Sequence, residues 1–309
     1  MLSRFKYHIL LHLIILLWGF TGILGKLIGL ESSYLVWHRV IIAFISLGVA
    51  MIFLKRSFRA TSKKSLFMMC AVGILVAIHW VTFYKSIQLS TASLGILCLS
   101  TTTVHVAWLE PLIMKKPISW IELSLSLVVI YGIYFVSGSF NSNDYIALAY
   151  GLTSAFLAAV FTVMNTKMVE SEPPSKITFY EMLSGSVFLS IMFLLQGRFN
   201  EKLFTFTTED FLWLLFLGVI CTSFAFLAAI EVMKKLGAFT VSLSINLEPV
   251  YTIVLAIFIL KENELLNTQF YIGSVIIVMV VIINAFIKYL AKKKKNSKHE
   301  SSTVLLDEL

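Results

Sequence analysis

The residues of this sequence that could do chemistry lie inside apolar stretches. The stretch from Leu236 to Glu262 is long enough to cross a bilayer, yet Asn246, Glu248 and Pro249 lie near its middle. A carboxylate and a helix-breaking proline at that depth are costly in hydrocarbon unless they face protein or a water-filled cavity. Glu248 is therefore either part of a solute pathway or a structural group bonded to a neighbouring helix. We favour the pathway, because ionisable residues inside membranes usually mark function.

Aromatic and titratable side chains lie at similar depth in three other apolar stretches. These are Trp18, His79, Trp80 and His105. The flat, amphipathic faces of Trp and His can hold an amphiphilic metabolite by stacking and by cation–π contact. Space filling explains either tryptophan equally well when it is taken alone. Together with Glu248 and Asn246, the set predicts a substrate pocket.

Three long cationic side chains, Lys26, Arg39 and Lys85, lie near the ends of apolar stretches. Such side chains can reach water while their carbon stems stay in the membrane. For Lys26 this, or a structural pair, is the preferred interpretation. Arg39 and Lys85 could instead gate the outer mouth of the pathway or contact an anionic group of the substrate, and the sequence leaves that choice open.

Several other kinds of site are disfavoured. Cys70, Cys98 and Cys221 all lie in apolar runs, as membrane-buried side chains do, and do not indicate a disulfide framework or a metal site. Neither a phosphate-binding P-loop nor the HExxH or GxSxG spacing of hydrolases is present, so we expect no cofactor, no metal and no ATP drive. The 25 basic and 17 acidic residues gather at the ends of apolar runs, which argues against nucleic-acid binding.

Composition sets the class of protein. Apolar residues make up 58% of the 309 residues and charged residues 14%, and the mean hydropathy is +0.88. These values are typical of an integral membrane protein. Because each crossing takes about 20 apolar residues, we expect an all-α protein with ten membrane helices. The predicted spans are His8–Gly29, Tyr34–Leu54, Leu66–Ile87, Ala92–Met114, Ser119–Gly138, Tyr145–Met168, Ile177–Leu195, Phe211–Met233, Ala238–Leu260 and Thr268–Leu290.

The charges of the short loops predict the orientation in the membrane. Basic residues gather in alternate loops, and such loops face the cytoplasm. They are Arg4, Lys6, the five in 55–64, Lys115, Lys116, Lys176, Lys234, Lys235 and Lys292–Lys295. Both termini of this multi-pass protein are thus predicted to be cytoplasmic. The basic tail, 291–309, is expected to be disordered and to lie near anionic lipid.

The chain divides into two similar halves at the polar segment Ser139–Asp144. Residues 1–138 and 144–290 each hold five predicted spans. Five is an odd number, so the second half enters the membrane upside down relative to the first. Secondary transporters use such inverted repeats, with the binding site between the halves. Helix lengths place Pro249 opposite the cluster 100–103, and we treat the shared Leu-Glu-Pro at 109–111 and 247–249 as coincidence.

Gly19, Gly22, Gly25 and Gly29 recur at three- and four-residue steps along the first predicted span. Small residues at this spacing let a neighbouring helix approach closely. We therefore expect this face to pack against other helices. The same face could also slide during transport.

Three motifs resemble the EamA group of the drug/metabolite transporter superfamily. They are WGFTGILGK at 18–26, His38-Arg39, and LEPVYTIVLAIFILKENE at 247–264 followed by a span that contains Gly273. The resemblance covers about residues 8–290. The first half departs from it, with Thr102 or Thr103 where the family often has proline and Lys116 where it often has glutamate. The resemblance implies an inner-membrane exporter of amino acids, related metabolites or drugs, with a central cavity lined mainly by spans one, three, four, six, eight and nine.

The mode of transport stays open at this point. Glu248, His79 or His105 could exchange a proton during the cycle, and facilitated diffusion or uptake is equally compatible with the sequence. An intramembrane enzyme or a channel is less consistent with it, because a channel more often builds its pore by oligomerisation. Substrate, direction and oligomeric state are not encoded in any of these motifs.

Overall fold

The computed structural model describes residues 2–115, 117–136, 140–236, 241, 244–245 and 247–307, and their regular secondary structure is helical, without strands. Within these residues, seven helical segments are long and apolar enough to cross a membrane, and three shorter apolar helices accompany them. The expectation of an all-α, multi-pass membrane protein is confirmed. The count of ten spans stays a prediction.

The helices follow one another with short connections. The first half contains α1 (Leu2–Leu27), α2 (Ser32–Phe53), α3 (Lys63–Leu89), α4 (Ala92–Ser100), α5 (Thr102–Met114) and α6 (Trp120–Val136). The second half contains α7 (Ser142–Met168), α8 (Pro174–Leu195), α9 (Glu201–Phe204), α10 (Thr208–Leu215), the π-helix η2 (Phe216–Phe224), α11 (Ala225–Leu236), α13 (Glu248–Leu260), the 3₁₀ turn η3 (Glu262–Glu264) and α14 (Thr268–Asp307).

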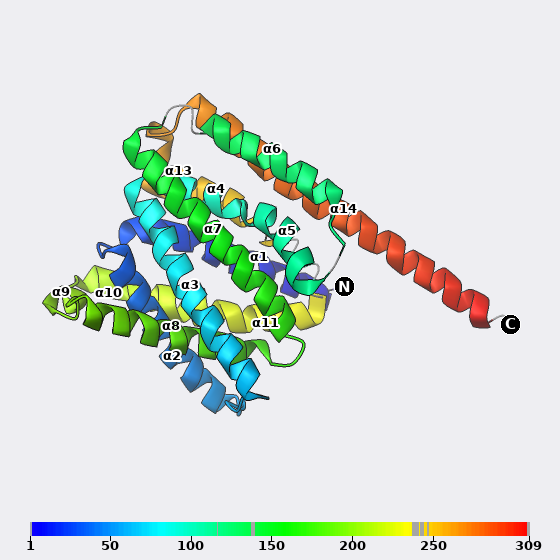
Figure 1. Cartoon of the computed structure of the whole chain (residues 1–309), viewed down its shortest axis with the longest axis horizontal. Coiled ribbons are helices and arrows are strands. Elements are labelled where there is room, and N and C mark those ends of the chain that lie inside the picture. Colours follow the sequence, from blue (N-terminus) through cyan, green and yellow to red (C-terminus); the bar gives the residue numbers. More distant parts are fainter. Residues whose placement is uncertain are drawn as a thin grey trace.

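Helix α14 differs from expectation at its C-terminal end. It continues as helix to Asp307, through the basic segment that the sequence predicts to be disordered. In Figure 1 this part of α14 projects beyond the rest of the bundle. The labelled N and C ends lie toward the same end of the molecule. We call that end the N-terminal end of the bundle and the opposite one the far end.

The ends of α2 and α8 have the same local geometry. The backbone is left-handed at Lys55 (φ 50°) and at Gly197 (φ 64°), positions that lie 197 − 55 = 142 residues apart. The next residue in each half, Arg56 or Arg198, donates its backbone N–H at 2.8 Å to the carbonyl five residues earlier. The same helix-ending motif therefore closes both helices.

A second correspondence links α5 and α13. Both helices have 13 residues, and both end at a left-handed lysine with φ 53°, Lys115 or Lys261, 261 − 115 = 146 residues apart. With this offset of 146 residues, Pro249 corresponds to Thr103. Thr103 belongs to the cluster 100–103 that the helix lengths place opposite Pro249. Pro111, by contrast, lies inside α5. The two Leu-Glu-Pro tripeptides are therefore not equivalent.

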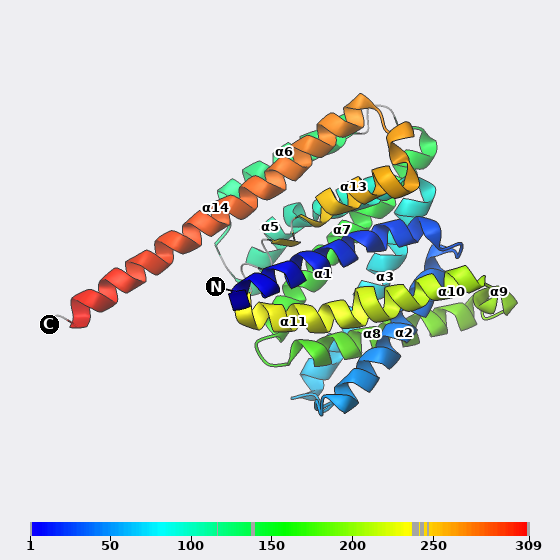
Figure 2. The ribbon, with the colours of Figure 1, turned by 180° about the vertical axis from the view of Figure 1, so that it is seen from behind.

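Helix α3 lies at the centre of the bundle, between α7 and α8, and α1 packs against α13 and α11. Helices α6 and α14 run side by side along one flank, as both views show (Figures 1 and 2). The predicted packing role of the α1 glycines is confirmed for two contacts. A Cβ at Gly19 would lie 3.0 Å from Thr252 Oγ1 of α13, and one at Gly25 would lie 2.7 Å from the Tyr84 ring of α3.

Candidate functional site

Arg39 lies at the centre of a buried polar cluster. It is on the second turn of α2 and only 3% exposed. Its guanidinium group stacks 3.8 Å from the centroid of the Trp80 ring. Its Nη1 donates to Tyr84 Oη at 2.8 Å, and its Nε donates to Thr222 Oγ1 at 3.2 Å. The planar guanidinium fork suits such combined stacking and hydrogen bonding, so the snorkelling interpretation of Arg39 is wrong.

The π-helix η2 positions Thr222. Thr222 Oγ1 donates to the Leu217 carbonyl, five residues earlier, at 2.8 Å, and Ser223 Oγ bonds the Gly218 carbonyl in the same way at 3.1 Å. A Cβ at Gly218 would lie 2.5 Å from Ile42 Cγ2 of α2, so a side chain there would crowd α2. Helical turns of the π type occur frequently at functional sites.

Glu248 is the first residue of α13 and half-buried. The charge of Arg39 acts on the Glu248 carboxyl group, although the two described side chains form no ion pair. Thr252 Oγ1 lies 3.0 Å from the Glu248 carbonyl and 3.1 Å from the Gly19 carbonyl, which ties the start of α13 to α1. Pro249 is the second residue of α13, which begins at Glu248, and the predicted break of a longer helix there stays a prediction.

The other predicted pocket residues divide between this cluster and other places. Trp80 belongs to the cluster through its contact with Arg39. Trp18 is half-buried and packs against Phe226 of α11, with ring centroids 5.7 Å apart. Asn246 lies outside the described residues. Lys85 is half-buried on α3, one residue beyond Tyr84, and is not among the groups hydrogen-bonded to Arg39.

Both histidines contact α7. His79 is 5% exposed, and its Nδ1 lies 2.9 Å from the Ser154 carbonyl and 2.8 Å from Ser154 Oγ. It therefore stabilises the seam between α3 and α7. His105 is half-buried between Trp108 and Phe156, with its ring 5.6 Å from that of Phe156. The single pocket that we expected from these side chains is thus not what the structure assembles.

The far end of the bundle contains a contact that sequence reasoning missed. The Glu262 side chain, 2% exposed, accepts the backbone N–H of Ala92 at 2.7 Å and that of Ser93 at 3.0 Å. A carboxylate at a helix N-terminus satisfies otherwise unpaired donors. Lys26 lies nearby and donates to the Ser90 carbonyl, which agrees with the structural role expected for it. Glu262 thus fastens the second half to α4 of the first.

A second contact at the far end joins the halves. Asp210, at the start of α10, accepts the backbone N–H of Gly29 at 2.7 Å. A shallow depression of about 320 Å³ lies beside it, lined by Gly25, Lys26, Ile28, Gly29, Leu30, Glu31 and Gln88. This hollow is at the ends of α1 and α3, away from Arg39.

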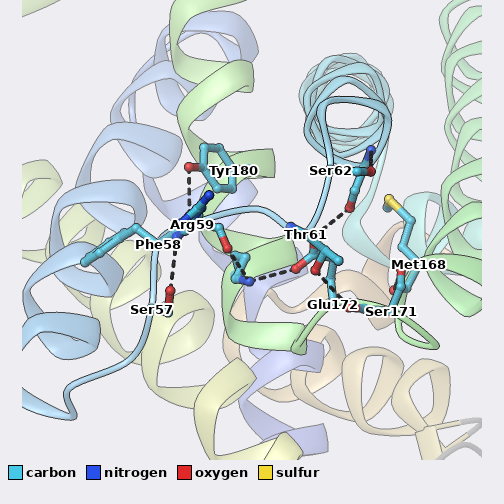
Figure 3. A network of polar contacts seen from close by, with 11 residues as sticks. Ser57, Phe58, Arg59, Thr61, Ser62, Met168, Ser171, Glu172 and Tyr180 are labelled. Carbon is cyan, nitrogen blue, oxygen red and sulfur yellow. Dashed lines mark hydrogen bonds and ion pairs between the residues drawn. The ribbon is translucent and has the colours of Figure 1, made fainter.

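The N-terminal end of the bundle carries a buried network around Glu172 (Figure 3). Glu172 lies in the connection between α7 and α8 and is 2% exposed. Its carboxylate accepts from Thr61 N at 2.6 Å, Ser65 Oγ at 2.8 Å and Lys176 Nζ at 2.7 Å. Lys176 Nζ also donates to the Arg59 carbonyl at 2.7 Å. The network thereby binds the connection between α2 and α3 to the second half.

These hydrogen bonds decide the charge of Glu172. Burial disfavours the ionised carboxyl group, but the hydrogen bonds from Lys176, Thr61 and Ser65 outweigh it. Together they lower the pKa of Glu172 to about 2. Glu172 is therefore an anion at neutral pH and forms a buried ion pair with Lys176.

Comparisons with known proteins agree with this architecture. The EamA-like transporter family model matches residues 5–138 and 145–286. An "Uncharacterized transporter" of Archaeoglobus fulgidus is 26% identical over 288 residues, which cover 90% of this chain and 96% of the relative. The "Uncharacterized transporter YxxF" of Bacillus subtilis is 23% identical over 244 residues, 77% of each chain. One solved crystal structure matches with a TM-score of 0.61 and 14% identity, over 90% of this chain and 97% of the other, which supports the fold alone.

The family model accounts for both halves of the chain, separated at the break near Asp144. The relatives that align along most of its length carry transporter names, which places this multi-pass membrane protein among transporters and not among enzymes. The chain belongs to the EamA-like transporter family.

Proposed function

We propose that the protein is a secondary transporter that exports amino acids or related small metabolites or drugs across the inner membrane. Transport proceeds by alternating access around a site between two inverted five-helix repeats. The two matches to one family model and the equal spacings at the ends of α2 and α8, and of α5 and α13, support the repeat. Both termini lie at the end of the bundle that carries the basic connections, which supports a cytoplasmic location for them.

The Arg39 cluster is the observation that carries this proposal. A guanidinium group held by Trp80, Tyr84 and Thr222 is ordered before any substrate arrives. Arginine binds carboxylates through its fork of N–H donors, and Glu248 offers an acceptor for an ammonium group. A substrate that carries both groups, as an amino acid does, fits a site with a cation from one half and an anion from the other. Trp18 supplies an apolar face on α1 nearby.

Contacts at both ends of the bundle support movement between two states. Glu262 and Asp210 join the halves at the far end, and Glu172 joins them at the N-terminal end. A pathway can open toward one side only if the contacts on that side separate. The hydrogen bonds of Glu262, Asp210 and Glu172 can break and re-form individually, which is compatible with a reversible transport cycle.

Exchange of labelled substrate in vesicles tests the proposal. The full chain is reconstituted into lipid vesicles and preloaded with single amino acids, related metabolites or cationic dyes, and uptake of the labelled compound is measured. We expect exchange for at least one amino acid or related zwitterion, and a large loss in Arg39→Gln and Glu248→Gln. Arg56→Gln and Glu201→Gln are matched controls, because both residues are exposed.

Two outcomes would redirect the proposal. Exchange restricted to dyes without a carboxylate would remove the amino-acid class, and unimpaired exchange in Arg39→Gln would remove Arg39 from the site. The alternative of uptake or facilitated diffusion is distinguished by the cell itself. A cell that lacks an exporter accumulates its substrate, whereas a cell that lacks an uptake carrier is depleted of it.

A further inference from the structure

A second carboxylate lies inside the helical bundle, away from Arg39. Glu181 is on α8, within a helix long and apolar enough to cross a membrane, and only 4% exposed. Its polar neighbour is the side chain of Asn165 on α7. The Glu181 Oε1 and Asn165 Oδ1 atoms are both buried, and neither has a hydrogen-bond partner among the described residues. The Asn165 side chain thus acts on the Glu181 carboxyl group as a hydrogen-bond partner, yet Glu181 Oε1 is left without a partner of its own.

The backbone of Glu181 is fixed at a crossing of the two halves. A Cβ at Gly73 of α3 would lie 2.6 Å from Glu181 Cα, which shows how closely α3 and α8 approach. The Glu181 carbonyl also accepts from Ser184 Oγ at 3.2 Å. The main chain of Glu181 cannot shift while this crossing is intact. A displacement of the second half relative to the first would change the surroundings of its carboxyl group.

No charged group of the described residues acts on Glu181. The helices around it carry many titratable groups: Tyr34, His38 and Arg39 on α2, Lys63, Lys64, Cys70, His79, Tyr84 and Lys85 on α3, Asp144, Tyr145, Tyr150 and Lys167 on α7, Lys176 and Tyr180 on α8, and Glu231, Lys234 and Lys235 on α11. Arg39 is bonded to Tyr84 and Thr222, and Lys176 to Glu172. A negative charge at Glu181 would thus be buried without a counter-ion, which is far more costly than burying a neutral acid.

We infer that Glu181 and Asn165 form a proton-binding site, in which the buried Glu181 Oε1 takes up a proton beside the Asn165 side chain. The proton comes from water and joins the carboxylate to give a neutral carboxylic acid. The neutral acid can be buried here without a counter-ion, and its O–H gives Oε1 a hydrogen to donate. The carboxylate re-forms when the proton returns to water after the halves have moved. The consequence for transport rests on the proposed function, because the proton would be the coupled ion.

Infrared difference spectroscopy tests the site without any substrate. Spectra of the full-length protein in phosphatidylcholine vesicles are recorded as the pH is raised, and each buried acid is detected by the C=O band of its protonated form. We expect a band that disappears at alkaline pH, is lost in Glu181→Gln and persists in Glu248→Gln. In Asn165→Leu we expect the same band at a shifted frequency, because its hydrogen-bond partner is removed.

Each contrary result overturns the inference. If Glu181→Gln keeps every C=O band of the wild type, the proton is bound by a group other than Glu181. If sodium chloride in place of choline chloride abolishes the band at constant pH, the site binds Na⁺. Should Glu181→Gln not fold, the spectrum of Asn165→Leu decides, and an unshifted band overturns the assignment. Because the spectra need no substrate, a chain that fails every exchange assay would still show the band, so the two proposals fail separately.

A transport measurement then tests coupling. In vesicles that exchange a labelled substrate, Glu181→Gln should retain exchange and lose accumulation driven by a pH gradient. Accumulation equal to that of the wild type would exclude Glu181 as the coupling residue. Glu201→Gln, at an exposed position outside the spans, is the matched control for the loss of one carboxylate.

Discussion

The carboxylate of Glu262 accepts the backbone N–H of Ala92 at 2.7 Å, across 170 residues of sequence. With its other oxygen on Ser93 N, it caps α4 from a loop of the other half of the chain. The corresponding position of the first half, 262 − 146 = 116, is a lysine, and an ammonium group cannot accept a backbone N–H. This cap therefore has no equivalent carboxylate at the other end of the bundle.

Substitution of Glu262 should lower stability. Glu262→Gln removes the charge at the start of α4 and leaves only one side-chain oxygen for two backbone donors. Helix caps of this kind contribute about 0.5–2 kcal/mol, so we expect a loss of about 1–2 kcal/mol and a lower midpoint of thermal unfolding in detergent. Glu264→Gln, two residues away and exposed, should unfold like the wild type. Equal midpoints for the two variants would contradict the cap.

Replacement of Arg39 by lysine should impair transport although the charge is kept. A lysine ammonium cannot stack on Trp80 and at the same time bond Tyr84 and Thr222 in one plane. Hydrogen bonds to charged groups contribute about 1.5–3 kcal/mol, so we expect at least a tenfold loss of exchange activity in vesicles. Arg56→Lys is the control at an exposed position. A variant Arg39→Lys with wild-type exchange would show that charge alone is needed.

The Glu172 network should weaken in acid. The pKa of Glu172 is lowered from 4.5 to about 2, so the ionised form stabilises the folded state above pH 4.5. That contribution, up to about 3 kcal/mol, is lost as the pH falls from 4.5 toward 2. Glu172→Gln removes it at every pH. The difference in unfolding midpoint between wild type and Glu172→Gln should therefore shrink over this interval, and a difference that is constant with pH would count against the ion pair.

The sequence predicts the helical spans and the break at Pro249, because hydrophobic length and proline act locally. It also predicts the pairing of α5 with α13, since helix lengths are read along the chain. The site itself is less predictable. Arg39 lies near the start of α2, where a long cation can reach water, and its burial depends on Trp80 and Thr222, which only the tertiary fold brings to it.

The missed carboxylates have a similar explanation. Glu262 follows a helix end and resembles an ordinary loop residue, because its partner at Ala92 is distant in sequence. Glu181 is only a few residues from the start of its predicted span, and such positions usually face water. The histidines show the opposite case, because their depth in the sequence predicts a place in the pocket that the fold does not give them. His79 lies at mid-depth, but its bonds to Ser154 turn it into the α3–α7 seam.

Enlargement of Gly73 should separate the halves where α3 crosses α8. A Cβ there would collide with Ser184 Oγ and with the Glu181 carbonyl oxygen, and would lie 2.6 Å from Glu181 Cα. The Ser184 side chain could rotate away, but the Glu181 main chain could not. Overpacking of this kind costs about 1–3 kcal/mol, so Gly73→Ala should lower the unfolding midpoint by several degrees. Gly29→Ala is the control, because its nearest neighbour, Asp210 Oδ1, would be at an ordinary 3.5 Å. If Gly73→Ala were as stable as Gly29→Ala, the close approach of α3 and α8 would be absent from the folded protein in solution.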